Sequence, residues 1–302
     1  MTTTSSSDPS RWRVLVTGAT GRVGFPLARA LAQRHDVFGL ARCQGEGDRA
    51  RLEGAGVVPI EADVATMDLG RLPADITHVF HAAARLGREA QDKDWQQVFA
   101  TNAHASGRLV AACAGASFVY CSTGSAYEYQ GQRPMREDDP PGVHLGAYSL
   151  SKIAGEAVVR YAAEVAGSPL IIIRIFSTYG PEGGTPVNRL RRIMRGEAIV
   201  LHPDAPNHYN PVYEDDYVRL AVRALQVASP DPVVVNFAGS ETVSAEEYCA
   251  YLGELVGRPA LIRYDPGAPW PIWPDVTRMH EVLGRTQVPW REGMRRVADA
   301  MA

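Results

Sequence analysis

The feature that most restricts the fold of this chain is a glycine-rich turn between an apolar segment and a helix-like one. Residues 12–17 have the apolar character of a short buried strand, and residues 25–33 follow a helical pattern. Glycine lets the backbone approach a ligand closely, and the free N–H groups at a helix N-terminus bind pyrophosphate. We therefore predict a dinucleotide-binding turn rather than a tight turn without a ligand. Its expected cofactor-binding residues are Gly18, Thr20, Gly21, Arg22, Val23 and Gly24.

Apolar strands and helices alternate along the first part of the chain. Near-continuous apolar strands separated by helices are typical of a parallel sheet that is covered on both faces. The pattern predicts the α/β class, with a doubly wound parallel Rossmann sheet and a smaller C-terminal substrate lobe. The further strands are expected at residues 36–41, 57–63, 78–83, 117–121 and 169–176, and the clearest helices at residues 100–113 and 148–165.

The composition changes after residue 180, where Gly and Pro become frequent. We expect a disordered tail over residues 1–10, a dinucleotide-binding domain over residues 11–180 and a mainly substrate-binding lobe over residues 181–302. Residues 210–240 are expected to return to the main domain, with a helix over 216–227 and a strand over 233–237.

Two groups of carboxylates have a structural interpretation. Asp215 and Asp216 stand where the expected helix begins, so they are interpreted as its N-terminal caps rather than as a paired acid/base site. The carboxylates of residues 137–139 lie in a segment bounded by proline and are expected to be solvated.

The composition excludes several classes of partner and site. The chain has 302 residues and a net charge of −3, which favours neither nucleic acid nor an anionic membrane as partner. It has no apolar stretch of transmembrane length and no apolar signal segment at its start. The four cysteines show no C-x-x-C spacing and fit a reducing compartment, so we expect a cytoplasmic protein. The histidines lack metal-ligand spacing, and no metal is expected.

The end of the second expected strand bears on the choice of cofactor. A carboxylate at this place would hydrogen-bond the ribose 2′-OH of NAD, whereas an arginine accommodates the 2′-phosphate of NADP. Arg42 stands here and no carboxylate does, so NADP(H) is favoured over NAD(H); the alternative is a solvated arginine and NAD. The further residues expected to contact the cofactor, at the ends of the third and fourth strands, are Asp63, Val64, Ala82, Ala83 and Ala84.

Tyr148 and Lys152 are spaced to act together. Residues at positions i and i+4 of a helix share a face, so the phenol and the ammonium group would point into the same volume. A nearby positive charge favours the phenolate, which suits tyrosine to acid/base work near neutral pH. The spacing alone occurs by chance in many helices, and its significance here depends on the glycine-rich turn that precedes it.

Together these motifs resemble the extended short-chain dehydrogenase/reductase group, also called the NAD-dependent epimerase/dehydratase family. The resemblance covers nearly the whole chain. It rests on Thr17-Gly-Ala-Thr-Gly-Arg-Val-Gly24, Asp63-Val64, His81-Ala-Ala-Ala84, Asn102, Tyr120-Cys-Ser-Thr-Gly-Ser-Ala-Tyr127, Glu137 and Pro141, Tyr148-x-x-x-Lys152, Arg174-Ile-Phe-Ser-Thr-Tyr-Gly-Pro181 and Asn210-Pro-Val-Tyr-Glu-Asp-Asp216.

The resemblance implies a catalytic set of Thr123, Tyr148 and Lys152. Thr123 would hydrogen-bond the reacting oxygen of the substrate, Tyr148 would exchange its proton, and Lys152 would lower the pKa of Tyr148 and hold the nicotinamide ribose. Ser122 is the second candidate for the hydroxyl role. The resemblance also implies a homodimer through the helices at residues 100–113 and 148–165. The candidate substrate-binding residues are Ser125, Ser177, Asn188 and Tyr209.

Three functions remain open from the sequence. The favoured one is an NADP(H)-dependent oxidoreductase that reduces a ketone, such as the 4-keto group of a nucleotide-activated deoxysugar. The alternative is a nucleotide-sugar epimerase that retains NAD tightly. A non-catalytic NADPH-binding regulator is disfavoured, because such proteins typically lose the tyrosine or the lysine. Gly124-Ser125 follows Thr123 where family dehydratases carry Asp-Glu, which argues against dehydration, and Ser177 replaces a common Asn.

Overall fold

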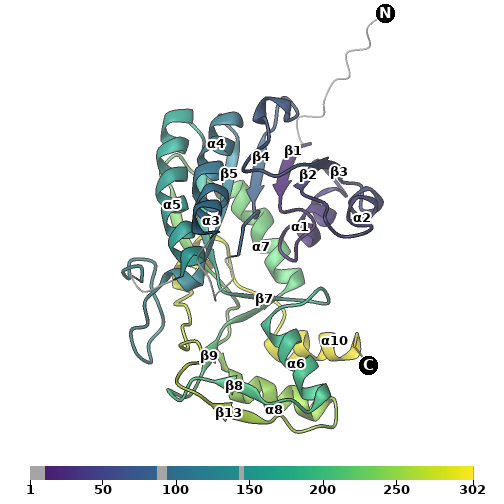
Figure 1. Cartoon of the computed structure of the whole chain (residues 1–302), viewed down its shortest axis with the longest axis vertical. Helices are drawn as coiled ribbons and strands as arrows, with labels where there is room; N and C mark the ends of the chain where they lie inside the picture. The colour runs from purple at the N-terminus through teal and green to yellow at the C-terminus, as the bar shows by residue number, and fades with distance from the viewer. Residues whose placement is uncertain (1–10, 87–93, 143–145, 302) are drawn as a thin grey trace, which may run out of the picture.

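A seven-stranded parallel sheet forms the upper part of the molecule in the computed structural model (Figure 1). The structure describes residues 11–86, 94–142 and 146–301, and the predicted tail over residues 1–10 lies outside the described residues. The strand order is β11-β6-β5-β4-β1-β2-β3. The strands are β1 (Arg13–Thr17), β2 (Asp36–Ala41), β3 (Val58–Glu61), β4 (His78–His81), β5 (Ser117–Thr123), β6 (Leu170–Ile175) and β11 (Val233–Phe237).

The chain changes direction across the sheet between β1 and β4. From β1 the strands run outward to β2 and β3, and from β4 they run the other way to β5 and β6. In an open α/β sheet, such a switch leaves a crevice at the carboxyl ends of the strands, where ligands bind. The predicted doubly wound parallel fold is confirmed, and the crevice lies where the glycine-rich turn begins.

Helices cover both faces of the sheet, and the alternation of side chains along each strand explains why. Val14 and Val16 of β1 pack on one face with α1 (Gly24–Leu31) and α7 (Glu214–Val227). Leu15, between them, packs on the opposite face with α4 (Ala105–Ala112) and α5 (Ala147–Ala166). Successive residues of a strand point to opposite faces, so both faces of this apolar sheet must be buried.

The helix predicted over residues 100–113 is divided in the structure. It comprises α3 (Trp95–Phe99), a widened π-helical turn (Ala100–His104) and α4. Within the turn, the carbonyl oxygen of Asn102 accepts hydrogen bonds from the Tyr120 hydroxyl (2.8 Å) and from the Ser106 hydroxyl (2.9 Å). Turns of this kind are frequent at functional sites, and this one lies beside the crevice.

A second, smaller body lies below the sheet in Figure 1 and has its own core. Val187, Leu190, Tyr248, Leu252 and Met294 are buried in that core. The lobe contains α6 (Thr185–Arg195), α8 (Ala245–Leu255) and α10 (Trp290–Asp299), with the strand pairs β7 (Ser177–Tyr179) and β10 (Pro211–Tyr213), β8 (Ile199–Leu201) and β13 (Ile262–Tyr264), and β9 (His208–Tyr209) and β12 (Val243–Ser244).

No helix among residues 11–86, 94–142 and 146–301 is both long and apolar enough to cross a membrane. The remaining helices are α2 (Asp48–Gly54) and α9 (Thr277–Val282), and the short 3-10 turns are Leu69–Arg71 and Gly124–Ala126.

The interpretation of Asp215 and Asp216 as helix caps is wrong. Helix α7 begins at Glu214, and no side chain caps it. The buried Asp216 carboxylate instead accepts hydrogen bonds from the backbone N–H groups of Gln287 and Val288, each at 2.7 Å. Asp216 therefore ties α7 to the C-terminal segment, a long-range contact that local sequence could not reveal.

The expectation that residues 137–139 are solvated is correct only for Asp138. The Glu137 side chain accepts a hydrogen bond from the backbone N–H of Asn236 at 2.9 Å. Asp139 pairs with both terminal nitrogens of Arg133, at 2.7 and 2.8 Å. Asp138 is 69% exposed. The Glu137 contact fixes the segment against the carboxyl end of β11, and the Asp139–Arg133 pair is local to the segment.

Candidate active site

A cavity of about 340 Å³ lies at the carboxyl ends of β1, β2, β3 and β4. The glycine-rich turn contributes Gly18, Thr20 and Gly21 to its wall. Each strand then delivers the residues that follow its last buried position, as the fold requires. The predicted cofactor-binding residues that line the cavity are Gly18, Thr20, Gly21, Arg42, Asp63, Val64, Ala82, Ala83 and Ala84.

The turn packs too closely for any residue but glycine at two positions. A Cβ on Gly18, whose φ is +66°, would lie 2.9 Å from the backbone nitrogen of Ala83. A Cβ on Gly24 would lie 2.3 Å from the Gly18 carbonyl oxygen, far inside van der Waals contact. Such a close turn at the start of α1 fits the pyrophosphate of a dinucleotide, whose oxygens need exposed backbone N–H groups.

Three of the predicted turn residues do not line the cavity. Gly24 is buried as the first residue of α1, where it allows the close packing described above. The Val23 carbonyl accepts a hydrogen bond from the Tyr217 hydroxyl, which joins the turn to α7. Arg22 is exposed and extends toward Gly183, since a Cβ on that glycine would meet the Arg22 side chain at 3.8 Å. Arg22 therefore lies between the turn and the smaller lobe.

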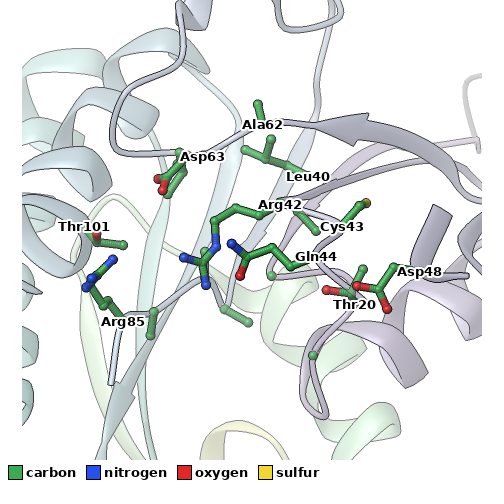
Figure 2. Close-up of a pocket in the computed structure, with 17 residues that line it drawn as sticks. Thr20, Leu40, Arg42, Cys43, Gln44, Asp48, Ala62, Asp63, Arg85 and Thr101 are labelled. Carbon is green, nitrogen blue, oxygen red and sulfur yellow. The ribbon is translucent and has the colours of Figure 1, made fainter. Parts of the chain in front are cut away.

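Arg42 is directed into the cavity from the end of β2 (Figure 2). Its side chain forms no ion pair with a carboxylate among the residues that the structure describes. Asp48 lies beside Thr20 in the same view, and its carboxylate accepts a hydrogen bond from the Gly45 N–H at 2.9 Å. The sequence analysis did not identify Gln44, Asp48, Arg85 and Thr101 as lining residues. Of these four, only Gln44 and Asp48 could have been predicted from the sequence, because they follow shortly after the second strand.

A buried hydrogen-bond chain supports the wall formed by the residues after β4. The Thr17 hydroxyl contacts the His81 ring at 2.7 Å and accepts from the Ala83 N–H at 3.0 Å. The other ring nitrogen of His81 lies 2.8 Å from the Ser106 hydroxyl. Burial, with the nearby Lys152 charge, lowers the pKa of His81 to about 3. His81 is therefore a neutral positioning group at physiological pH.

Asn102 fixes the next part of the wall to α5. Its side-chain oxygen accepts from the Arg85 N–H at 2.8 Å, and its amide nitrogen donates to the Arg85 carbonyl at 3.0 Å. The same nitrogen donates to the Ser151 hydroxyl at 2.9 Å, and Ser151 donates to the Tyr148 carbonyl at 2.7 Å. The segment that follows β4 and lines the crevice is thereby held against the helix that carries Tyr148.

Thr123 and Tyr148 lie next to each other, and neither residue lines the cavity at the glycine-rich turn. Thr123 is the last residue of β5, and its hydroxyl accepts from the Ser125 N–H at 3.1 Å. Tyr148 lies in the first turn of α5 and is half-buried. Burial raises the pKa of Tyr148, and the hydrogen bond with Thr123 and the Arg22 charge oppose that effect only in part. The structure thus brings the predicted proton donor to the predicted hydroxyl group.

Lys152 lies one helical turn further along the same face of α5. It is 1% exposed, and its Nζ lies 4.3 Å from the centre of the Tyr120 ring, a cation–π contact. Burial lowers the pKa of Lys152 to about 8. In this structure the Lys152 side chain is turned toward the Tyr120 ring, and its effect on the pKa of Tyr148 stays a prediction.

A buried ion pair follows on the same helix face. Glu156 accepts two hydrogen bonds from Arg174 of β6, at 2.9 and 2.8 Å, and another from the Ser122 hydroxyl. Arg174 also donates to the Tyr127 hydroxyl at 2.8 Å. Ser122 is therefore committed to Glu156, which leaves Thr123 as the hydroxyl that faces Tyr148. Sequence reasoning assigned no role to Glu156, although its spacing from Lys152 places it on the same face.

A second cavity, of about 370 Å³, adjoins the Thr123 end of β5 and reaches into the smaller lobe. Trp270 forms one wall. Its ring stacks on the Tyr129 ring with ring centres 4.6 Å apart, and the centre of the His202 ring lies 3.9 Å from the centre of the Trp270 ring. Asn188 lies outside this lining, because its side chain is exposed and bonds to Arg191 at 3.3 Å. The predicted substrate-binding residues that do line it are Ser125, Ser177 and Tyr209, joined by Gly124, Ser149, Phe176, Thr185, Trp270, Ile272 and Pro274.

The profile of the NAD dependent epimerase/dehydratase family matches residues 14–238 of the chain. The chain belongs to this family. It is 30% identical to the dTDP-4-dehydro-6-deoxy-D-allose reductase of Streptomyces bikiniensis, over 95% of this chain and 96% of that protein. It is 25% identical to the Uncharacterized UDP-glucose epimerase YtcB of Bacillus subtilis, over 90% and 92% of the two chains.

Solved structures of the family share the fold. The UDP-Glucuronic acid 4-epimerase from Bacillus cereus, in complex with UDP-Glucuronic acid and NAD, superposes with a TM-score of 0.82 and 25% identity. The match covers 95% of this chain and 98% of the other. The chain is therefore an enzyme of the extended short-chain dehydrogenase type with a pyridine nucleotide cofactor, and the glycine turn and the crevice fit that group.

Proposed function

We propose that this enzyme is an NADP(H)-dependent reductase of a ketone, acting on the 4-keto group of a nucleotide-activated deoxysugar. The observation that carries the choice of cofactor is Arg42, a cation without a carboxylate partner that points into the crevice. A 2′-phosphate would provide the missing anion. The full-length similarity to a dTDP-4-dehydro-6-deoxy-D-allose reductase supports the choice of reaction.

The residues divide the reaction between them. When bound, the nicotinamide supplies the hydride that reaches the carbonyl carbon. Tyr148 gives its phenolic proton to the carbonyl oxygen as the carbon is reduced, so the ketone becomes an alcohol and Tyr148 must be reprotonated. Thr123 donates a hydrogen bond to the same oxygen and orients it. Positioned proton transfer of this kind contributes about 10²–10⁴-fold in rate.

Lys152 and the two parts of the molecule complete the proposal. The buried Lys152 ammonium holds the nicotinamide ribose, and its charge favours the Tyr148 phenolate that remains after proton transfer.

Residues 11–180, together with 210–240, bind the cofactor, and the rest of 181–302 binds the substrate. The exposed Tyr161 and Val165 on α5, 72% and 71% accessible, support a homodimer through α4 and α5. The enzyme acts in the cytoplasm.

An epimerase that retains NAD is the second candidate. The solved relative carries NAD together with a UDP-sugar, and this observation favours it. Asp48 beside Thr20 would then accept from a ribose hydroxyl. A non-catalytic NADPH-binding regulator is a weaker hypothesis, because Thr123, Tyr148 and Lys152 are all present and Thr123 contacts Tyr148.

The proposal is tested by identifying the nucleotide that the purified protein carries and by measuring which nucleotide it binds more tightly. The protein is denatured, any released nucleotide is identified by mass spectrometry, and the apoprotein is titrated with NADPH and NADH. Binding of NADPH at least about ten-fold tighter than NADH, about 1.4 kcal/mol, together with oxidation of NADPH by a dTDP-4-keto-6-deoxysugar, is expected. Stoichiometric NAD(H) that survives purification would overturn the reductase and favour the epimerase.

A further inference from the structure

Lys152 is a buried cation that has no direct counter-ion. The residue is 1% exposed, and it forms no ion pair with a carboxylate among the residues that the structure describes. The Tyr120 ring, whose centre lies 4.3 Å from Nζ, contacts the ammonium but carries no net charge. Burial without an anion favours the neutral amine, so the charge of Lys152 depends on the groups that surround it.

Most ionisable groups that face Lys152 are neutral at physiological pH. Burial lowers the pKa of His81, in β4, to about 3. In β5, burial raises the pKa of Tyr120 well above its ordinary value and raises the pKa of Cys121 to about 12. On α5, burial also raises the pKa of Tyr148. None of these four groups provides a negative charge that would stabilise the ammonium.

Glu156 provides an anion on the same face of α5. It lies four residues after Lys152, one helical turn further along the helix. Its side chain is 8% exposed. Burial lowers the pKa of Lys152 to about 8, and the charge of Glu156 opposes that effect. Buried charges are screened little, so this carboxylate acts on the ammonium from beyond hydrogen-bond distance.

A buried network holds the Glu156 carboxylate in place. It accepts from Nε and Nη2 of Arg174 at 2.9 and 2.8 Å and from the Ser122 hydroxyl at 2.5 Å. Nη1 of Arg174 donates to the Tyr127 hydroxyl at 2.8 Å, and this hydroxyl donates to the Asn236 side chain at 2.6 Å. Charge-assisted bonds within such a network are strong and directional. The carboxylate therefore cannot turn away from the lysine.

We propose that Glu156 is a positioning residue of the active site: its carboxylate keeps the neighbouring Lys152 ammonium charged, and Arg174 fixes that carboxylate. The charged form of Lys152 is the one that binds the nicotinamide ribose and stabilises the Tyr148 phenolate. This inference rests on the proposed function, because it explains how Lys152 keeps the charge that its role there requires.

The test is an NMR titration of the full chain with carbon-13 at the ε-carbon of lysine. The only other lysine in the sequence is Lys93, so a Lys93→Arg background leaves the signal of Lys152 alone. We expect this signal to report a pKa of about 8. Glu156→Gln is expected to lower that pKa by about 1–2 units, the effect of losing a nearby opposite charge. Glu156→Asp, which keeps the charge, is expected to lower it less.

Glu164→Gln is the matched control. It makes the same change at an exposed position of α5, where solvent screens the charge. The pKa of Lys152 is expected to stay within about 0.2 units of its value in the background protein.

The pH dependence of turnover gives a second readout. The charged lysine is lost as pH rises through its pKa, so a lower pKa brings the loss of activity to lower pH. With NADPH and a dTDP-4-keto-6-deoxysugar, the alkaline limb of the kcat profile is expected to move down by about 1–2 units in Glu156→Gln. A merely structural role of Glu156 would lower kcat without moving this limb.

Two outcomes overturn the assignment: an unchanged pKa of Lys152 in Glu156→Gln, or an equal fall in Glu164→Gln. If Glu156→Gln does not fold, the double variant Glu156→Gln/Arg174→Gln, which leaves neither charge of the pair buried alone, decides by the same criteria. A lowered pKa of Lys152 in an enzyme that reduces no 4-keto sugar would refute the proposed reaction and leave the role of Glu156 intact.

Discussion

The cofactor crevice and the region of the second cavity and the smaller lobe satisfy their polar groups differently. Behind the crevice, Thr17, His81, Ser106 and Asn102 form a continuous buried chain of hydrogen bonds. In and near the smaller lobe, several buried polar atoms lack partners, and one of them belongs to Ser177, which lines the second cavity. Among the described residues, the unpartnered side-chain atoms are Ser177 Oγ, Thr178 Oγ1, His208 Nδ1 and Trp273 Nε1, all of them near or in the smaller lobe.

The difference shows which part of the site is complete before a substrate arrives. A satisfied network is rigid and holds backbone N–H groups where a constant ligand needs them. Unpartnered buried polar groups are costly, and a ligand that bonds to them recovers that cost. The crevice is thus preorganised, whereas the unpartnered groups in and near the smaller lobe are ones that a ligand could satisfy.

The largest expected effect concerns Tyr148, whose neighbour Ser149 lines the second cavity. Tyr148→Phe removes the proton donor and is expected to lower kcat by about 10²–10⁴-fold, while NADPH binding stays within about two-fold. Steady-state kinetics and fluorescence titration check both values. Tyr161→Phe, at an exposed position of the same helix, is the control and should retain full activity. Equal loss of cofactor affinity and of kcat in Tyr148→Phe would show that the two cavities are not separable.

Arg42→Ala tests whether the Arg42 side chain determines the preference of the crevice for NADPH over NADH. Its Kd for NADPH is expected to rise by about 10- to 100-fold, and its Kd for NADH to stay nearly constant, because only NADPH carries the 2′-phosphate. Arg49→Ala, which breaks an exposed pair with Glu53 on α2, is the control. A parallel loss for both nucleotides would contradict the role given to Arg42.

The satisfied network also predicts how stability depends on pH. The folded state keeps His81 neutral, since its pKa lies near 3, whereas the unfolded chain binds a proton below about 6.5. The unfolded state therefore binds more protons between these values, and the free energy of unfolding should fall as pH falls, by up to about 1.4 kcal/mol per unit. Urea unfolding from pH 7.5 to 4.5 measures this slope. His81→Gln should make the free energy of unfolding less dependent on pH. An unchanged slope in this variant would show that other groups cause the pH dependence.

The smallest effects compare one hydroxyl from each region. Ser106→Ala leaves a ring nitrogen of the buried His81 unpaired and is expected to lower the free energy of unfolding by about 1–3 kcal/mol. Ser177→Ala removes a hydroxyl without a partner, so it should leave stability unchanged or raised by about 0.5 kcal/mol. Urea denaturation of the two variants without substrate makes the comparison. Equal destabilisation would remove the distinction between the regions.

Local chemistry explains the parts of the fold and site that the sequence predicted. The glycine spacing, the apolar strands and the four-residue spacing of Tyr148 and Lys152 each act over a few residues, and each lies where expected. Arg42 lines the crevice because the carboxyl ends of adjacent parallel strands meet at one edge of a sheet.

Long-range packing decided the rest. Asn188 was expected in the substrate site, yet its neighbour Arg189 is the residue that turns inward. Adjacent residues on a helix point about 100° apart, and only the packing of α6 in the smaller lobe selects the buried one. Asp216 likewise bonds to residues far along the chain rather than capping its own helix. The sequence by itself determined the glycine-rich turn and the sheet, whereas the tertiary structure alone decided which side chains of the smaller lobe turn inward, because their orientation depends on contacts between distant segments.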